Sequence, residues 1–458
     1  MKKTNLILLL LCAIGVFGLI VPTNAQKEEV TYRLTLDEAI DFALKNNQTI
    51  KTKELDKDIA ESQVGEILAD GLPQVNGNVD FGYNYKIQRI FVSGDAFDPN
   101  GDPNETISRE FGTDYNGTVS LGLEQMVFDG AYFIGLKAAR TFTELSSKDH
   151  IKTQIDVVEA VSKAYYLVLV NQERKKLINT NYQRIDSLLR DTQLLYKNGF
   201  AERIDVSRVK VQFNNIKVEK NNIEDVLDLS QSLLKFQMGI SPKVQLELVD
   251  EINLIDFTPM SNELVNSFSY DRRIEYSQLQ TQKELNQLDI RNINSRYIPK
   301  LDLYGSLGMI SGTSDLGELV SIGGDRWSSV GVVGLRMSVP IFDGLRKSNQ
   351  VQQRKLKARQ IDYSFMQLRN SIDTEIEQAT ANYNKSTDNM EAQRENMELA
   401  ADVYRVTKIK FEEGVGSNSE VLDADATLTE SQTNYYNALY DALISKIELE
   451  KALGTLMN

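Results

Sequence analysis

The stretch Gly414–Ala424, "GVGSNSEVLDA", follows residues 345–413, a run that contains neither glycine nor proline. Because both residue types break helices, the run predicts one helix about 100 Å long at a rise of about 1.5 Å per residue. The glycines of the stretch end that helix, and the spacing of Ser417 and Glu420 is that of a capping box that begins another. The stretch therefore predicts a reversal between two long helices, with Glu420 and Asp423 just behind it.

An apolar residue recurs at every seventh position along the run before this reversal. The positions are Ile376, Tyr383, Met390, Met397, Tyr404 and Phe411. Small side chains, among them Ala379 and Ala400, lie along neighbouring positions. A seven-residue period is typical of helices that pack side by side as in coiled coils. A simple two-stranded coiled coil is one structure that would satisfy it.

The reversal and its surroundings occur twice in the chain. Matching positions 214 or 215 residues apart are Gly199 and Gly414, Asp205 and Glu420, Met238-Gly239 and Leu453-Gly454, and Phe128-Asp129-Gly130 and Phe342-Asp343-Gly344. This spacing predicts two tandem copies, residues 26–239 and 261–458, joined by a connecting, equatorial segment at 240–260.

Each copy is predicted to contain a helix, a strand pair, a long helix and a further helix, in that order. In the first copy a helix of about 35 residues begins at the capping box Thr35–Glu38 and ends before Pro73, because proline stops a helix. A strand with one apolar face follows, since polar residues alternate with Val79, Phe81, Tyr83, Tyr85 and Ile87. The loop 93–112, which holds two prolines, is expected to be an exposed tip. Further strands are expected near residues 115–127, 301–310 and 329–341.

Residues 1–25 predict a cleaved signal peptide rather than part of the fold. Two lysines precede an apolar stretch, and Thr23-Asn24-Ala25 is a small-x-small cleavage site. An uncleaved anchor is the alternative. The only cysteine, Cys12, lies inside the apolar stretch after Leu11, so lipidation there is not expected and the mature chain has no thiol.

The remaining composition argues against several kinds of site and partner. Removal of the two lysines of the signal leaves 49 basic and 65 acidic residues, a net charge of −16, which disfavours nucleic acid as a partner. His150 is the only histidine, so one chain cannot form a metal site with several histidines. No Walker A sequence, dinucleotide fingerprint or Cys–His couple occurs, and therefore neither an enzyme nor a bound cofactor or metal is expected.

The four expected strands are each long enough to cross a membrane when tilted. Four strands leave two open edges, which lipid does not tolerate, so the strands must close with other copies of the chain. Aromatic residues near strand ends fit the interfacial girdle of an outer-membrane barrel, although plain core packing would explain each of them equally well: Phe111, Phe128, Tyr297, Trp327 and Phe342.

Three motifs resemble those of the TolC-type outer-membrane efflux protein family. Leu34–Ile40, "LTLDEAI", resembles the family's first helix, and Ser338–Gly344, "SVPIFDG", resembles its second strand-to-helix junction. Val421–Ala424, "VLDA", followed by Leu453–Leu456, "LGTL", resembles its last helix. The similarity extends in order over essentially the whole mature chain.

The resemblance implies a mixed α and β fold in which three chains form one 12-stranded outer-membrane β-barrel. A long α-helical barrel would continue it through the periplasm of a Gram-negative bacterium. The implied function is the exit duct of a tripartite efflux or type I secretion system, through which substrates pass passively. Its partners would be two other copies, a periplasmic adaptor, an inner-membrane transporter of the RND, ABC or MFS type, and outer-membrane lipid. A periplasmic coiled-coil scaffold is the alternative, although a scaffold has no need of amphipathic strands.

The resemblance also gives the reversal a function. In the family these turns lie at the periplasmic tip of the duct, and an acidic pair is spaced like Glu420 and Asp423. With Asp205 of the first copy, these acids would line the pore constriction and favour cations. Phe411 stands where a tyrosine often packs in the gate. The tip turns themselves would be formed by Gly199, Gly414 and Gly416.

Two simpler readings of the acids and one departure from the family pattern remain. Glu420 could only cap the last helix, where an acid also favours the helix dipole. A calcium loop at Asp423-Ala-Asp425 is not expected, because these acids lie on a helix without further spaced oxygens. Gly416 replaces an arginine of the family pattern, so a salt-bridge lock of the closed state is not carried over, and Arg203 or Arg208 are candidates for that role.

Overall fold

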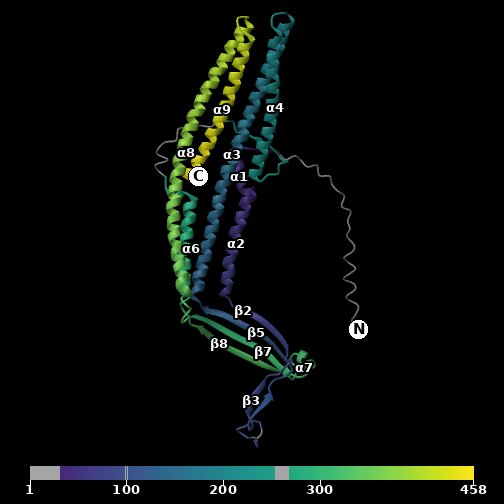
Figure 1. Ribbon diagram of the computed structural model, residues 1–458, viewed down its shortest axis with the longest axis vertical. Helices are drawn as coiled ribbons and strands as arrows, with labels where there is room; N and C mark the ends of the chain where they lie inside the picture. Colours follow the sequence, from purple (N-terminus) through teal and green to yellow (C-terminus); the bar gives the residue numbers. More distant parts are fainter. Residues whose placement is uncertain (1–30, 98, 101, 253–267, 458) are drawn as a thin grey trace, which may run out of the picture.

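The computed structural model describes residues 31–97, 99–100, 102–252 and 268–457. The predicted signal peptide and part of the connecting segment therefore lie outside the described residues. Figure 1 shows an elongated molecule in which long helices run side by side and a four-stranded sheet continues from one end of them. The class predicted from the sequence, mixed α and β with long helices, is confirmed.

The first half of the chain begins with a short strand and two helices that lead into the sheet. Its elements are β1 (Thr31–Leu34), α1 (Leu36–Asn46), α2 (Gln48–Asp70), β2 (Gln74–Tyr83), β3 (Arg89–Ser93), β4 (Thr106–Glu110), β5 (Tyr115–Phe128), α3 (Gly130–Lys197) and α4 (Arg203–Met238).

The second half has a similar order. Its elements are β6 (Gln245–Leu248), the 3-10 turn η2 (Tyr270–Arg272), α6 (Ile274–Ser295), β7 (Lys300–Thr313), α7 (Leu316–Val320), β8 (Trp327–Ser338), α8 (Arg346–Glu412) and α9 (Asn418–Leu453). None of the helices in the described part of the chain combines the length and the hydropathy of a membrane span.

The first predicted helix is in fact two helices. The capping box at Thr35 and Glu38 is present, but α1 ends at Asn46. The side chain of Asn47 then caps α2, accepting hydrogen bonds from the amides of Thr49 at 2.8 Å and Ile50 at 3.3 Å. The amide group of Asn47 also donates to the carbonyl of Gln237 at 2.7 Å, so a contact distant in sequence fixes the break.

The strand pair of the first half also differs from the prediction. β2 begins at Gln74 and ends at Tyr83, so Tyr85 and Ile87 lie beyond it. Part of the predicted exposed loop pairs instead, as the antiparallel hairpin β3–β4. This hairpin projects past the end of the sheet that is remote from the long helices (Figure 1).

The four-stranded sheet is antiparallel with the order β2-β5-β7-β8, so β2 and β8 are its edges. Side chains alternate along a strand, so every second residue points to the same face of the sheet. The register aligns these positions across all four strands. The apolar face contains Val75, Val79, Phe81, Val119, Leu121, Leu123, Leu303, Leu307, Met309, Val333, Leu335 and Met337. Most of them are exposed, and Val333 has 78% of its surface accessible.

The opposite face of the sheet is mostly polar, although Ile310, Val330 and Val332 also lie on it. It carries Gln74, Asn76, Asn78, Asp80, Thr118, Ser120, Glu124, Asp302, Ser306 and Arg336. The guanidinium of Arg336 lies 4.7 Å from the ring centre of Tyr304 on this face. The sheet is therefore amphipathic in the way the alternation predicted, with its apolar side uncovered within one chain.

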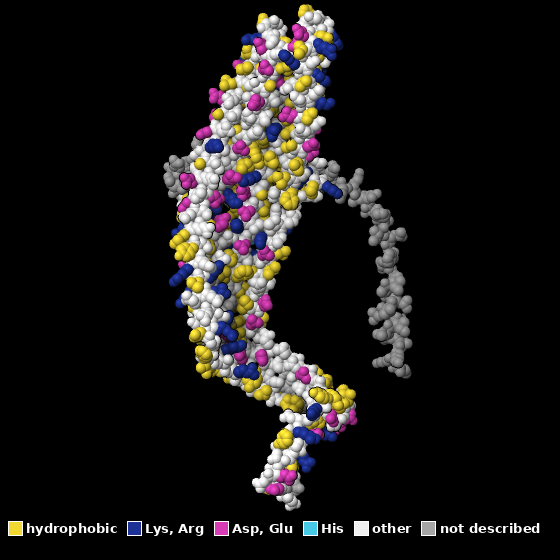
Figure 2. Space-filling view, in the orientation of Figure 1, with side chains coloured by type: hydrophobic (Ala, Val, Ile, Leu, Met, Phe, Trp, Pro, Cys, Tyr) yellow, Lys and Arg dark blue, Asp and Glu magenta, His cyan; other side chains and the backbone are white. Residues whose placement is uncertain are grey.

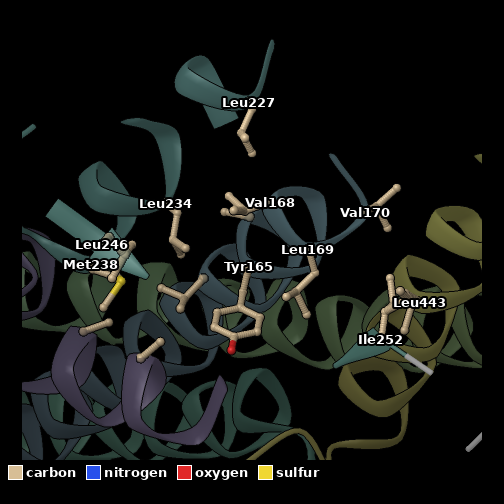
Figure 3. Close-up of a cluster of buried hydrophobic side chains, with 14 of the residues drawn as sticks. Tyr165, Val168, Leu169, Val170, Leu227, Leu234, Met238, Leu246, Ile252 and Leu443 are labelled. Carbon is tan, nitrogen blue, oxygen red and sulfur yellow. The ribbon is translucent and has the colours of Figure 1, made fainter. Parts of the chain in front are cut away.

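The principal core lies midway along the helices, where α1, α3, α4, α9 and the parallel pair β1–β6 meet. Figure 3 shows Tyr165 at its centre, with Leu234, Met238 and Leu246 close by. The Tyr165 hydroxyl donates to Asp250 at 2.8 Å, and the same carboxylate oxygen accepts the amide of Leu36 at 2.8 Å.

The predicted seven-residue seam of α8 is confirmed. Ile376, Tyr383 and Met390 are buried, and the three later positions of the seam are half-buried. α8 packs along α9, and α3 packs along α4, so the chain forms two long helical hairpins that stand beside each other (Figure 1).

Candidate functional site

Each hairpin reverses at a glycine. Gly199 follows α3 with φ 81° and Gly414 follows α8 with φ 75°, in the left-handed region that favours glycine. Behind α8, the amide of Gly414 binds the carbonyl of Phe411 at 3.0 Å and the amide of Val415 binds that of Lys410 at 2.9 Å. This pair of bonds is a Schellman motif, and the same pair follows α3.

Glu420 and Asp423 lie exposed in the first turns of α9. The Ser417 hydroxyl accepts a hydrogen bond from the Glu420 amide, and the Glu420 carboxylate accepts one from the Ser417 amide, both at 3.2 Å. Glu420 is therefore a helix-capping residue and a solvent-facing acid at the same time. Asp423 is one turn further along the same helix.

Asp205 occupies the matching position at the start of α4. Its carboxylate accepts the amide of Glu202 at 3.1 Å, so this acid also caps a helix. The side chain of Asn418 donates to the carbonyl of Asp205 at 3.4 Å, and Arg208 donates to the hydroxyl of Ser419. The structure thus brings the starts of α4 and α9 together, and Arg208 links them through a hydroxyl rather than through an acid.

Phe411 and Gly416 lie at the end of α8. A Cβ atom on Gly416 would lie 3.0 Å from the backbone nitrogen of Phe411 and 3.2 Å from Lys410. This close approach explains why a residue without a side chain stands there. An arginine could be accommodated only if the last turn of α8 shifted.

A groove of about 980 Å³ separates the two hairpins near their tips. α3 and α8 form its walls, and its lining includes Arg184, Asp191, Leu195, Tyr404, Lys408 and Phe411. The lining of the groove contains charged side chains of both signs as well as apolar side chains. Phe411 therefore faces the space between the hairpins instead of the interior of its own hairpin.

Arg184, which lines this groove, belongs to a largely buried ion pair. The Nε of Arg184 on α3 lies 2.5 Å from the Oδ1 of Asp425 on α9, and the guanidinium stacks 4.7 Å from the ring centre of Tyr404. Asn181, one turn before Arg184, donates to Gln432 at 3.2 Å. Polar side chains therefore join the two hairpins near their tips.

The environment of Asp425 is unusual for an acid. Only 1% of its surface is exposed, and burial raises the pKa of its carboxyl group although the adjacent Arg184 cation opposes that rise. Asp425 is thus paired with Arg184 inside the protein, whereas Asp423 is exposed to solvent. Sequence reasoning missed this pair, yet Asp425 follows Val421 and precedes Leu428 at helical spacing, and an acid on an apolar helix face was the available signal.

Comparison with known proteins agrees with this architecture. A model of the outer membrane efflux protein family matches residues 39–239 and 273–455. Outer membrane protein TolC of Salmonella enteritidis is 23% identical over 90% of this chain and 80% of its own length. Alkaline protease secretion protein AprF of Pseudomonas aeruginosa is 21% identical over 75% of this chain and 71% of its own length.

Solved structures show the same fold. The crystal structure of the Campylobacter jejuni CmeC outer membrane channel matches with a TM-score of 0.71 at 18% identity, covering 92% of this chain and 85% of that one. The family match spans both hairpins and the whole sheet. The chain belongs to the outer membrane efflux protein family, and it is an outer-membrane protein whose helical part lies in the periplasm.

Proposed function

We propose that three copies of this chain form a closed duct from the periplasm to the cell exterior. Four strands from each copy would make a 12-stranded β-barrel, and the hairpins would make an α-helical barrel below it. The duct would passively export substrates that an inner-membrane transporter of the RND, ABC or MFS type delivers through a periplasmic adaptor. The two halves of the chain would be tandem copies of one unit.

The four-stranded sheet carries this proposal. Its apolar face is exposed within one chain, its other face is mostly polar, and β2 and β8 are the edges of the sheet. In lipid, open edges leave backbone groups without hydrogen bonds at a cost of several kcal/mol each. Closure of β2 on β8 of the next copy satisfies the edges, turns the apolar face to lipid and encloses the polar face around water. A periplasmic scaffold would gain nothing from this sheet.

Cysteine cross-linking between the edges tests the trimer. Because Cys12 is the only native cysteine and precedes the predicted cleavage site, introduced cysteines would be the only thiols of the mature chain. One cysteine replaces Val79 of β2, and a second replaces Ser329, Gly331 or Val333 of β8 in turn, because these three residues lie on the same face of the sheet as Val79. We expect oxidised dimers and trimers in outer-membrane fractions for one register of the three. Monomers in all three, with free cysteines that remain reactive, would refute closure through these edges.

Within this duct, Glu420, Asp423 and Asp205 of three chains would surround the pore at the hairpin tips. The two acids of α9 alone would supply six carboxylates, and a ring of acids favours cations over anions. Their exposure at adjacent turns of one helix supports this assignment. Phe411 would pack in the gate at the hairpin tips, which would move apart when the adaptor engages. Gly199, Gly414 and Gly416 would form the tip turns.

Reversal potentials in planar bilayers under a KCl gradient test the ring. The double variant Glu420→Gln/Asp423→Asn keeps the shape of both side chains and removes two charges per chain. We expect its cation selectivity to fall markedly. The matched control Glu391→Gln/Asp402→Asn removes two exposed acids from α8 and should leave selectivity unchanged. Equal selectivity in the wild type and both variants would exclude the acids from the pore.

The proposal extends to the class of substrate that the duct exports. The relatives named above include a protein whose name refers to protease secretion, and the family name refers to efflux. Both roles use a passive duct of this design. Accumulation of a dye substrate in a deletion strain, set against secretion of an exported protease through the same duct, would separate drug efflux from polypeptide secretion.

A further inference from the structure

The short helix α7 lies in the connection between β7 and β8, at the end of the sheet remote from the long helices (Figure 1). Four residues form a row across the sheet at this end, one on each strand: Phe81, Gly117, Ser311 and Trp327. The register places this row on the apolar face of the sheet. Its two central members are small, which leaves a shallow depression between two aromatic residues.

Trp327 and α7 fill that depression. A Cβ atom on Gly117 would lie 2.8 Å from the Trp327 ring and 2.9 Å from a methyl group of Leu319. The Trp327 ring meets Phe81 edge to face, with centroids 6.3 Å apart. Only 7% of Trp327 and 2% of Leu319 is exposed. α7 is therefore seated on the apolar face of the sheet, and Trp327, predicted to be a girdle residue, lies beneath it.

The outer side of α7 is apolar as well. Leu316, Val320 and Ile322, here termed the α7 patch, have 54%, 64% and 53% of their surfaces exposed. Figure 2 shows hydrophobic side chains gathered at this end of the sheet. Such a grouping on a surface marks an interaction site.

The acids of the segment Asp315–Glu318 are engaged within the protein. Asp315 accepts the amide of Gly317 at 2.7 Å, and Glu318 accepts a hydrogen bond from Thr313 and pairs with Arg326 at 3.4 Å. Glu318 therefore has a cation partner, and the carboxylate of Asp315 is bound by a backbone amide at the start of α7.

We propose that the α7 patch inserts between lipid acyl chains just below the headgroups of the outer leaflet, as an interfacial anchor on the outside of each protomer. This inference rests on the proposed function, which turns the apolar face of the sheet to lipid. Two observations favour lipid over a second copy. α7 contacts the central strands β5 and β7, whereas neighbouring copies would meet the edges β2 and β8. The α7 patch is also continuous with the apolar face of the sheet, which faces lipid in the proposed duct.

The chain provides its own probe, because Trp327 is its only tryptophan. The full-length trimer is reconstituted into phosphatidylcholine vesicles whose acyl chains carry bromine either near the headgroup or near the chain end. We expect Trp327 emission to be quenched more by the shallow bromines than by the deep ones. In the variant Leu316→Ser/Val320→Ser/Ile322→Ser, quenching by the shallow bromines should be lost in large part. Leu229→Ser on α4, which also replaces an exposed leucine, should retain it.

Two results would overturn the proposal. If a second copy covers the α7 patch, neither bromine position quenches Trp327, and the triple serine variant lowers the temperature at which the trimer dissociates. If water covers it, neither bromine position quenches Trp327, and the triple serine variant leaves the temperature at which the trimer dissociates unchanged. A separate probe tests the proposed function: Leu335→Trp in a Trp327→Phe background reports on the middle of the apolar face. Quenching of this probe by the deep bromines, with Trp327 unquenched, would reject the α7 anchor alone, and failure of both would reject the lipid-facing sheet.

Discussion

The hairpins α3–α4 and α8–α9 have similar helix lengths and similar turns, but they pack against different neighbours. Their first helices have 68 and 67 residues, their second helices have 36 each, and each of the four helices ends one or two residues before a left-handed glycine. Yet α3 packs extensively against α1, α2, α4, α6 and α9, whereas α8 packs extensively against α6 and α9. α8 consequently leaves apolar side chains exposed, including Tyr363, Met366, Leu399 and Val403.

The difference shows that length and turn chemistry are set locally, while burial is set by neighbours. α3 acts as the central helix of one chain. The uncovered apolar side chains of α8 are what a helix would present to another copy, in keeping with the proposed trimer. Where the two hairpins meet, Arg184 and Asp425 are the contact whose loss should matter most.

Removal of the Arg184 cation should give the largest effect on the contact between the hairpins. Arg184→Met leaves Asp425 buried without a partner, and breaking a buried pair in this way costs about 3–5 kcal/mol. Thermal unfolding of the detergent-solubilised protein, followed by circular dichroism, measures it. Arg394→Met is the matched control, because Arg394 pairs with Glu391 on the exposed surface of α8 and such pairs contribute about 0–1 kcal/mol. Equal effects of the two variants would show that the Arg184 pair does not hold the hairpins together.

The glycines at the two ends of each hairpin should respond unequally to alanine. Gly239 and Gly454 have φ 73° and 71°, and a Cβ there would lie 2.6 Å from the carbonyl of Asn46 and 2.8 Å from that of Arg272. The left-handed backbone and the overpacking together predict a loss of about 2–4 kcal/mol for each.

Gly199 and Gly414 supply the comparison for this test. Their φ values are similar, but nothing lies within 4 Å of a Cβ at either position. Alanine there should cost only the backbone strain, about 1–2 kcal/mol. Unfolding midpoints of the four single variants measure both classes, and four equal losses would mean that the close contacts relax without cost.

The pH dependence of Arg184→Met should be the next effect in size. In the folded protein burial raises the pKa of Asp425 above its usual value, so between these two values the folded state binds more protons than the unfolded state and stability falls as pH rises. Loss of Arg184 removes the opposing cation, raises this pKa further and widens that window. The deficit of Arg184→Met should therefore be smaller at pH 4 than at pH 7, by about 1.4 kcal/mol for each unit of additional pKa shift. The double variant Arg184→Met/Asp425→Asn should lack this additional slope.

Local features of both hairpins could be predicted from the sequence, and features fixed by distant partners could not. The reversals at Gly199 and Gly414 and the capping boxes at Thr35 and Ser417 depend on neighbouring residues, which the sequence displays directly. The break at Asn47 depends on a carbonyl 190 residues away.

Pairing at long range limited the prediction of the candidate site in the same way. Arg184 and Asp425 lie 241 residues apart, and only the packing of α3 against α9 brings them together. The exposed acids Glu420 and Asp423 could be identified because their spacing alone places them on one helix. The seat of α7 on the sheet was unpredictable, since it depends on a row of residues contributed by four strands.

Replacement of the capping residues should give the smallest change in stability. It tests whether the two hairpin tips are capped differently. Ser417 caps α9 through its hydroxyl, so Ser417→Ala should cost about 1 kcal/mol. Glu202 stands at the same position before α4, and glutamate is not among the residues preferred at an N-cap, so Glu202→Ala should cost only a few tenths of a kcal/mol, from the charge near the helix dipole. Amide hydrogen exchange in the first turns of α4 and α9 measures both. Faster exchange in α9 alone is the expected outcome, whereas equal acceleration in both helices would mean that the two tips are capped alike despite their different side chains.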